Sequence, residues 1–289
     1  MNQKFKGYAA GILAAVLYGT NPLGTLQLYQ DGINSGSVLF YRYALATLMF
    51  AVWMLATRED FRVKAGHLIR FALLGAFFAL SSTTLYVSFH YMDAGVASTI
   101  LFCYPIMTAL LMVVFYHEKV KWATTLSIAL AVTGIALLYR GDGDVKLSTT
   151  GIMLVMVSSL LYALYIIAVN QWKTEYSSVK FTFWIVFFGM LTILAYSMIA
   201  GEPVQLLFGT TQWICAAQLA LLPTVLSLYF MNIAIKHIGS TPSAIMGAFE
   251  PITAVAIGVL VFGESFTLRL ACGIVLILSA VILIILRGK

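Results

Sequence analysis

Charged residues are scarce in this sequence, and their scarcity excludes an ordinary soluble domain. Only 10% of the 289 residues are charged and 61% are hydrophobic, whereas a soluble domain has about 25% charged and roughly 45–50% apolar residues. The composition therefore predicts a membrane protein. The formal net charge of +6 does not indicate a nucleic-acid partner, because the basic residues fall in short gaps between apolar runs and form no single stripe.

Cysteine is almost absent as well. Cys103, Cys215 and Cys272 lie inside apolar runs and have no ligand spacing, which excludes a disulfide framework and a zinc site. The histidines lie at or near the ends of apolar runs, where no catalytic role is expected. We therefore expect neither a metal nor a cofactor.

Motifs of membrane-embedded enzymes are also missing. The sequence contains no G-x-S-x-G and no nucleophile beside a positioned base. The GDGD at 141–144 matches the G-x-G-D of intramembrane aspartyl proteases, but no second aspartate occupies a neighbouring span. A turn is expected there instead, and an enzyme is the disfavoured alternative.

Long apolar runs are what the sequence has in abundance. A bilayer core of about 30 Å needs about 20 apolar residues per helix, and runs of that order recur along the whole chain. We predict an all-α integral membrane protein. Its ten transmembrane helices are expected at residues 7–29, 34–56, 68–91, 94–116, 121–140, 149–171, 178–200, 211–236, 240–262 and 267–287.

The distribution of lysine and arginine predicts the orientation of these spans. Cytoplasmic loops carry an excess of both residue types, and a cytoplasmic N-terminus places 13 of the 17 on that side. Arg140, Lys146 and Arg269 fall outside, and Arg42 remains within a span. We therefore predict that both termini are cytoplasmic.

The two halves of the sequence repeat each other. A shift of 146 positions aligns residues 91–119 with residues 237–265 without a gap, which pairs Pro105 with Pro251. Since each half holds five predicted spans, the second half must enter the membrane from the opposite side. We expect inverted five-helix repeats at 1–143 and 144–289. Such repeats are typical of secondary transporters, which bind substrate near the midplane between them.

These features resemble the EamA group of the drug/metabolite transporter superfamily. Each half has a proline-centred helix and a closing glutamate, Glu118 and Glu264, and the resemblance extends to Arg42 and to the Glu250-Pro251 pair. It covers nearly the whole chain. It implies an alternating-access transporter of small organic metabolites in the bacterial cytoplasmic membrane. Relatives carry amino acids, nucleobase-related metabolites, drugs, nucleotide sugars or sugar phosphates, so the resemblance leaves the substrate open.

Glu250 is the acidic residue that is predicted to lie clearly at mid-membrane. It falls ten residues into the ninth span, which is about 15 Å at about 1.5 Å per residue. A charged group at a helix centre costs at least ~2.5 kcal/mol, so it normally faces an interior cavity. We predict that Glu250 couples proton movement to substrate or orients a cationic substrate group. The alternative is a packing residue that stabilises a bent helix.

Other polar residues gather on helix faces at symmetry-related positions. An offset of 144 superposes Tyr18 on Tyr162, and the offset of 146 places Asn232 opposite Tyr86. Small-molecule sites are usually built from such aromatic walls with a few fixed polar groups. The predicted substrate-binding and coupling residues are Glu250, Tyr18, Asn21, Tyr86, Tyr104, Tyr162, Tyr165, Asn232 and Arg42, and the predicted helix kinks are at Pro22, Pro105 and Pro251.

For Arg42, a structural role is expected ahead of contact with substrate, because a buried guanidinium can snorkel or bond backbone carbonyls. The predicted cavity suits a neutral, zwitterionic or cationic metabolite with an apolar body, such as an amino acid or a related amphipathic compound. Exchange of nucleotide sugars or sugar phosphates is the alternative, but a diphosphate favours several cations facing the cavity.

The expected partners are a small-molecule substrate, membrane lipid and protons as the coupling ion. The sequence leaves the direction of transport open, and export stays a hypothesis. One chain is expected to suffice, with a dimer as the alternative.

Overall fold

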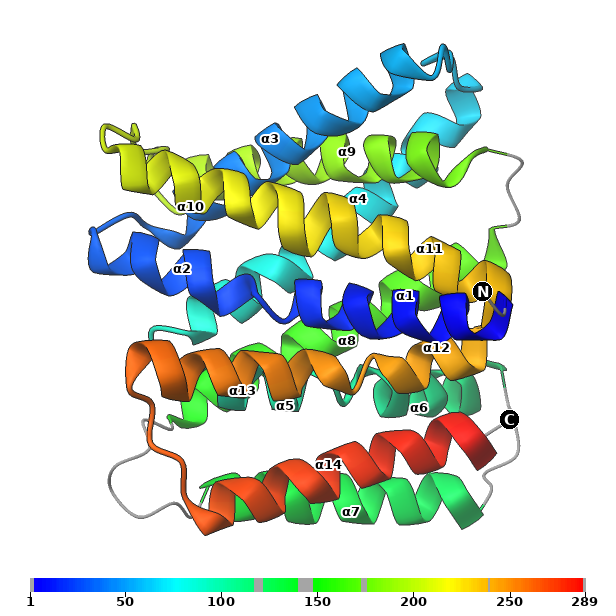
Figure 1. The fold of residues 1–289 in the computed structure, drawn as a ribbon, viewed down its shortest axis with the longest axis vertical. Coiled ribbons are helices and arrows are strands. Elements are labelled where there is room, and N and C mark those ends of the chain that lie inside the picture. The colour runs from blue at the N-terminus through cyan, green and yellow to red at the C-terminus, as the bar shows by residue number, and fades with distance from the viewer. Residues whose placement is uncertain (1–2, 117–121, 140–147, 173–175, 239, 288–289) are drawn as a thin grey trace.

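The computed structural model describes residues 3–116, 122–139, 148–172, 176–238 and 240–287. Every regular element within these ranges is a helix (Figure 1), which confirms the all-α prediction for this part of the chain. The helices are α1 (Gln3–Tyr18), α2 (Asn21–Gln30), α3 (Ser35–Ala56), α4 (Ala65–Ser88), α5 (Ala94–Leu101), α6 (Tyr104–Tyr116), α7 (Trp122–Tyr139), α8 (Thr149–Gln171), α9 (Ser178–Ile199), α10 (Thr210–Ala220), the π-helix η1 (Leu221–Leu226), α11 (Ser227–Ile238), α12 (Ser240–Met246), α13 (Phe249–Phe262) and α14 (Leu268–Arg287).

Eight helical stretches are long and apolar enough to cross a membrane. Two further helical stretches, Trp122–Leu137 and Phe249–Phe262, are apolar but shorter. The structure is therefore that of an integral membrane protein. Glu118, Arg140, Lys146 and the GDGD turn at 141–144 lie outside the described residues.

Four of the stretches are interrupted near their middle. A short turn separates α1 from α2, α5 from α6 and α12 from α13, and η1 joins α10 to α11. Pro22, Pro105 and Pro251 each lie in the first turn of the helix that follows a break, where a missing backbone N–H costs no hydrogen bond. The predicted kink positions therefore coincide with the starts of half-helices.

At three of the four breaks, side chains satisfy carbonyl groups that the break releases. The Asn21 amide donates to the carbonyl of Tyr18 at 2.8 Å, and the Thr224 hydroxyl donates to the carbonyl of Leu219 at 3.1 Å. The Ser159 hydroxyl, from the second half of the chain, donates to the carbonyl of Leu101 at 3.1 Å. Hydrocarbon offers no hydrogen bonds, so broken backbone is tolerated only where the protein itself supplies the partners.

The two halves of the chain are interleaved. The most extensive helix pairs join one half to the other: α7 with α14, α1 with α11, α4 with α8 and α9, α3 with α9, and α5 with α13. Figure 1 shows α7 beside α14 and α1 beside α11. The hydrophobic core of the protein is therefore shared between the halves, and each half covers the apolar faces of the other.

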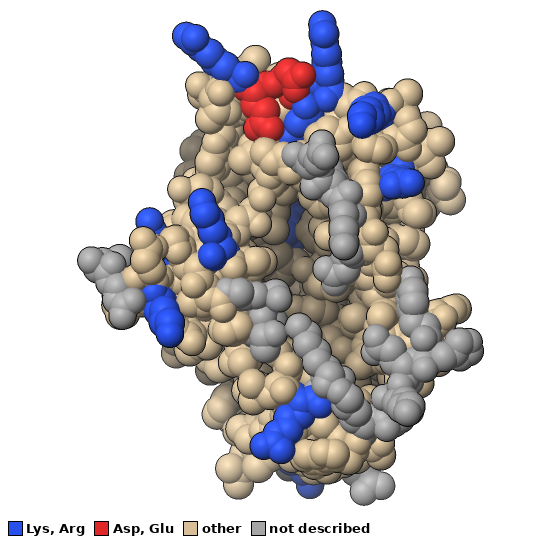
Figure 2. Space-filling model, turned by 90° about the vertical axis from the view of Figure 1, so that its right-hand side faces the viewer, with Lys and Arg blue, Asp and Glu red and all other residues tan. Residues whose placement is uncertain are grey.

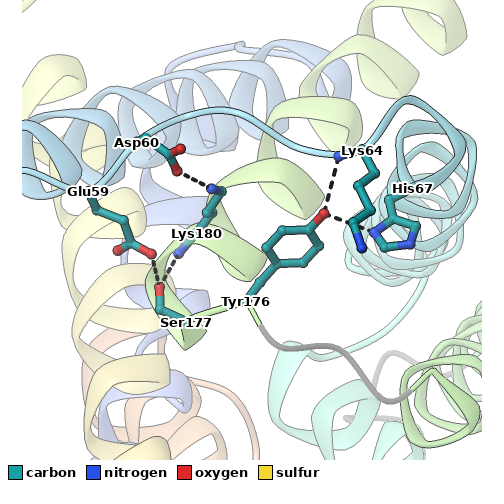
Figure 3. Close-up of polar contacts among 7 residues, drawn as sticks. All are labelled: Glu59, Asp60, Lys64, His67, Tyr176, Ser177 and Lys180. Atoms are coloured by element: carbon teal, nitrogen blue, oxygen red, sulfur yellow. Dashed lines mark hydrogen bonds and ion pairs between the residues drawn. The ribbon is translucent and has the colours of Figure 1, made fainter.

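Figure 1 also shows that α1 begins and α14 ends on the same side of the bundle, which we call the termini end. At this end the loop between α3 and α4 is bound to the start of α9 (Figure 3). The buried Lys180 ammonium forms an ion pair with Asp60, and the Ser177 hydroxyl donates to Glu59. The Lys180 ammonium also lies 5.3 Å from the ring centroid of Tyr176. Polar contacts thus join the halves at the surface as well.

Close approach of α4 and α9 depends on glycine, so Gly75→Ala is expected to destabilise the bundle. A Cβ atom at position 75 would lie 2.8 Å from the backbone nitrogen of Gly189 and 2.8 Å from the carbonyl oxygen of Ile185. Such overpacking costs roughly 1–3 kcal/mol, which a lower melting temperature in detergent would report. Gly66→Ala is the control, because nothing lies within 4 Å of a Cβ atom there. Equal melting temperatures for the two variants would contradict the packing argument.

Candidate functional site

A cavity of about 100 Å³ lies where the broken helices meet. Its lining comes from both halves of the chain and includes three tyrosines, Tyr18, Tyr104 and Tyr162, together with Phe78 and Glu250. Apolar groups make up most of the wall. Sites for small organic molecules commonly combine such a wall with a few polar groups that fix orientation.

Glu250 reaches this cavity because the chain breaks just before it. The turn at Gly247–Ala248 ends α12, and Glu250 lies in the first turn of α13, where the unsatisfied backbone N–H groups of a helix favour a negative charge. In the described part of the chain its carboxyl group forms no hydrogen bond and no ion pair within 4.0 Å, although the charge of Arg42 acts on it from a greater distance. A carboxylate that faces a cavity without a partner is available to a ligand or to a proton.

Arg42 is also buried, with 1% of its surface exposed, but its side chain is already engaged. Its Nε donates to the Thr224 hydroxyl at 3.0 Å, and its Nη1 donates to the Tyr86 hydroxyl at 2.9 Å. The Tyr86 hydroxyl in turn donates to Oδ1 of Asn21 at 2.9 Å. Nη2 has no hydrogen-bond partner among the described residues. The guanidinium thus joins α3 and α4 of the first half to η1 of the second.

Aromatic rings surround the charge of Arg42. Its guanidinium carbon lies 5.9 Å from the ring centroids of Tyr18 and Tyr43 and 5.6 Å from that of Tyr86. Each distance is within the range of a cation–π interaction, which is worth about 2 kcal/mol or more when the cation is desolvated. Because Tyr18 also lines the cavity, the Arg42 network forms a layer directly beside it.

The tyrosines of the cavity wall support one another. The rings of Tyr104 and Tyr162 are nearly perpendicular with centroids 4.7 Å apart, and Tyr162 stacks on Tyr165 at 5.7 Å. Tyr165 also packs against Phe78 with centroids 5.3 Å apart. The first pair is edge-to-face and the second is stacked, and such contacts stabilise aromatic pairs.

The structure separates the predicted site residues into distinct groups. Four line the cavity: Tyr18, Tyr104, Tyr162 and Glu250. Three form the adjoining hydrogen-bond network: Arg42, Tyr86 and Asn21. Tyr165 lies behind Tyr162, where it packs in the aromatic stack.

Asn232 is not brought to the cavity. Its side chain is exposed on α11, whereas its repeat-related counterpart Tyr86 is completely buried. In an inverted repeat the two positions fall toward opposite ends of the bundle, and the helices are packed around Tyr86 but not around Asn232. A sequence offset compares two positions of the chain and cannot report this difference in packing.

Thr224 is a residue of the site that the sequence reasoning missed. It follows Pro223 inside an apolar run, and its hydroxyl makes the bond to the Leu219 carbonyl that proline at 223 cannot make. It also accepts the bond from Arg42. The signal that could have found it is a proline-threonine pair at the centre of a predicted span.

Comparison with known proteins identifies relatives over the full length. A family model described as the EamA-like transporter family matches residues 5–140 and again residues 149–286. An uncharacterized transporter of Archaeoglobus fulgidus is 24% identical over 277 residues, which cover 96% of this chain and 95% of that protein. An uncharacterized transporter of Clostridium kluyveri is 23% identical over 303 residues, with 94% and 91% covered. A solved crystal structure has the same fold, with a TM-score of 0.66 at 15% identity over 98% of this chain and 96% of that one.

Removal of the Tyr86 hydroxyl is expected to destabilise the protein. Tyr86→Phe leaves Nη1 of Arg42 and Oδ1 of Asn21 without their partner in a buried site, and an unsatisfied buried polar group costs about 1–3 kcal/mol. Tyr165→Phe is the matched control, because the structure gives the Tyr165 hydroxyl no hydrogen bond with a described residue. Thermal unfolding in detergent should separate the two variants, and equal losses would argue against the network.

Proposed function

Because the chain belongs to the EamA-like transporter family, we propose that it moves small organic metabolites across the bacterial cytoplasmic membrane by alternating access. It is an integral membrane protein of the drug/metabolite transporter superfamily, and the names of its relatives indicate a transporter rather than an enzyme. The substrate, the coupling ion and the orientation below are proposals.

The proposed topology has ten spans with both termini in the cytoplasm. The helices that begin and end the described chain lie at the termini end of the bundle, as a topology with an even number of spans requires. The excess of lysine and arginine on that side of the predicted spans supports a cytoplasmic location for it. The opposite end of the bundle is then the outer one.

The observation that carries the proposed site is the unpaired carboxyl group of Glu250 in a cavity between interleaved halves. In an apolar interior such a group is costly unless a ligand or a proton neutralises it. We propose that Glu250 receives the amino group of a substrate in one step and a proton in another. Exchange between the two would couple transport to the proton gradient.

The lining favours an amphipathic substrate that carries an amino group, such as an amino acid. The rings of Tyr18, Tyr104 and Tyr162 offer faces for an apolar body and for cation–π contact. Among the described residues that line the cavity there is no lysine or arginine. Nucleotide sugars and sugar phosphates are therefore the weaker candidates, because a diphosphate needs several cations.

Glu250→Gln is expected to abolish transport or uncouple it from the proton gradient while the protein stays folded. A hydrogen bond to a charged group is worth about 1.5–3 kcal/mol, so substrate affinity should fall roughly 10–150-fold. Glu202→Gln, on an exposed loop, is the control for the same change of side chain. Wild-type, pH-dependent transport by Glu250→Gln would remove the proposed role.

The substrate can be identified with purified protein in liposomes. A panel of amino acids, amines and phosphorylated sugars should be tested for uptake and for counterflow, with and without a pH gradient. We expect saturable uptake of an amine-bearing compound and acceleration by substrate on the other side of the membrane. Linear uptake without this acceleration would indicate a pore instead.

A further inference from the structure

The two broken helices α5–α6 and α12–α13 pack closely at one end of the bundle only. Their halves at the outer end, α5 and α13, lie against each other, and a Cβ atom on Gly95 would be 2.8 Å from the Cα of Val255. The halves at the termini end, α6 and α12, do not pack along each other within the described ranges. The inverted repeat would make these two contacts equivalent, so the structure has broken the symmetry.

The termini end has a depression, whereas α5 and α13 are packed against each other toward the outer end. Figure 2 views this end and shows a depression at its middle, with basic side chains scattered around it. The repeat-related residues Tyr86 and Asn232 also differ between the two ends. Tyr86, toward the outer end, is buried, whereas Asn232, toward the termini end, is exposed. In the orientation proposed above, this is an inward-facing arrangement with a closed outer side.

One side chain joins the two helices at the closed side. Glu264 follows α13, and its Oε1 accepts from the backbone N–H of Ala94 at 2.8 Å while its Oε2 accepts from that of Gly95 at 3.3 Å. These are the first N–H groups of α5, which the preceding Asp93 does not cap with its own side chain. The second half of the chain therefore caps a helix of the first half.

The backbone conformation after α13 positions the Glu264 carboxyl group at the start of α5. Gly263 adopts the left-handed conformation with φ of 69°, and the N–H of Glu264 donates to the carbonyl of Gly258 at 2.9 Å. A Cβ atom on Gly258 would lie 2.0 Å from Oε2 of Glu264 and 2.5 Å from its Cδ. Only glycine at 258 leaves room for the carboxyl group against α13.

We infer that Glu264 is a latch that holds the outer side of the transporter shut by capping α5, and that the outward-facing state forms when this cap is released. The inference rests on the proposed alternating-access function and goes beyond it by naming the contact that must break. A rocking motion that separates α5 from α13 pulls the carboxyl group off both N–H donors together. The latch therefore contributes to one access state and not to the other, which is what a gating residue requires.

The surroundings of Glu264 suit a side chain that leaves its place. A cavity of about 440 Å³ adjoins it on the outer surface and includes Tyr29, Gln30, His90 and Asp93 in its lining. Burial raises the pKa of the Glu264 carboxyl group, while the two N–H donors act in the opposite direction. Glu264, which is partly buried, itself lines this cavity, so a released carboxyl group can move into an open, polar space.

The test measures how readily the cavity is reached from outside. Leu85, which lines the cavity, is replaced by cysteine in a variant whose cysteines at 103, 215 and 272 are alanine. A membrane-impermeant thiol reagent is added to the outer side of intact cells or oriented vesicles. Glu264→Ala should increase the labelling rate about tenfold or more, because loss of a charge-assisted hydrogen bond shifts a two-state equilibrium by that order.

Gly258→Ala is the decisive second variant. Its Cβ atom would displace the carboxyl group of Glu264 from its position without changing the Glu264 residue itself. We expect it to increase labelling as Glu264→Ala does, and we expect the double variant to label no faster than Glu264→Ala alone. Glu264→Gln, which keeps one oxygen acceptor but loses the charge, should fall between. Gly66→Ala, in open space at the start of α4, should leave labelling unchanged.

Two results would overturn the latch. One is wild-type labelling in both Glu264→Ala and Gly258→Ala when size-exclusion profiles show folded protein. The other is a further increase in the double variant, which would mean that Gly258→Ala acts on helix packing and not through Glu264. Labelling requires no knowledge of the substrate, so failure of the latch and failure of the Glu250 site are read from different experiments.

Discussion

The whole structure depends on one property of its solvent: hydrocarbon cannot form hydrogen bonds with a broken backbone. Four helical stretches of this chain are nevertheless interrupted near their middle. They are possible only at the centre of the bundle, where Asn21, Ser159 and Thr224 donate to the released carbonyls. The polar residues of the interior are thus needed for the breaks. The breaks in turn bring backbone turns and the first residues of half-helices, Glu250 among them, to the cavity.

Two ionisable side chains, Arg42 and Glu250, are accommodated in the protein interior in different ways. Arg42 keeps its charge, which hydrogen bonds to Tyr86 and Thr224 and three aromatic rings stabilise. These contacts are consistent with the structural role that the sequence predicts for Arg42 ahead of contact with substrate. Glu250 has no such partner in the described structure and faces the cavity. This difference is why we propose a binding role for Glu250 and a supporting role for Arg42, although both carry the cost of burial.

The interleaving of the halves links this site to movement. Because the largest helix contacts lie between the halves, a displacement of one half against the other must repack both sides of the cavity. Inverted repeats make the two ends equivalent in sequence but leave them free to differ in packing. Here α5 and α13 pack closely against each other, while α6 and α12 do not pack along each other within the described ranges. In the proposed mechanism, interactions at the ends of these helices, such as that of Glu264 with α5, therefore influence which side of the transporter is closed.

The sequence by itself determined the membrane class, the helical stretches, the repeat and the position of Glu250, because hydropathy, proline spacing and internal similarity are local properties of the chain. It also brought Tyr18, Tyr104 and Tyr162 into one predicted pocket, and they line one cavity. Only the tertiary structure decided that Arg42 is engaged by Thr224, that Asn232 is exposed, and that Glu264 fits against Gly258. Each of these depends on which helix of the other half lies alongside. Two repeats with the same pattern do not encode that choice in either copy alone.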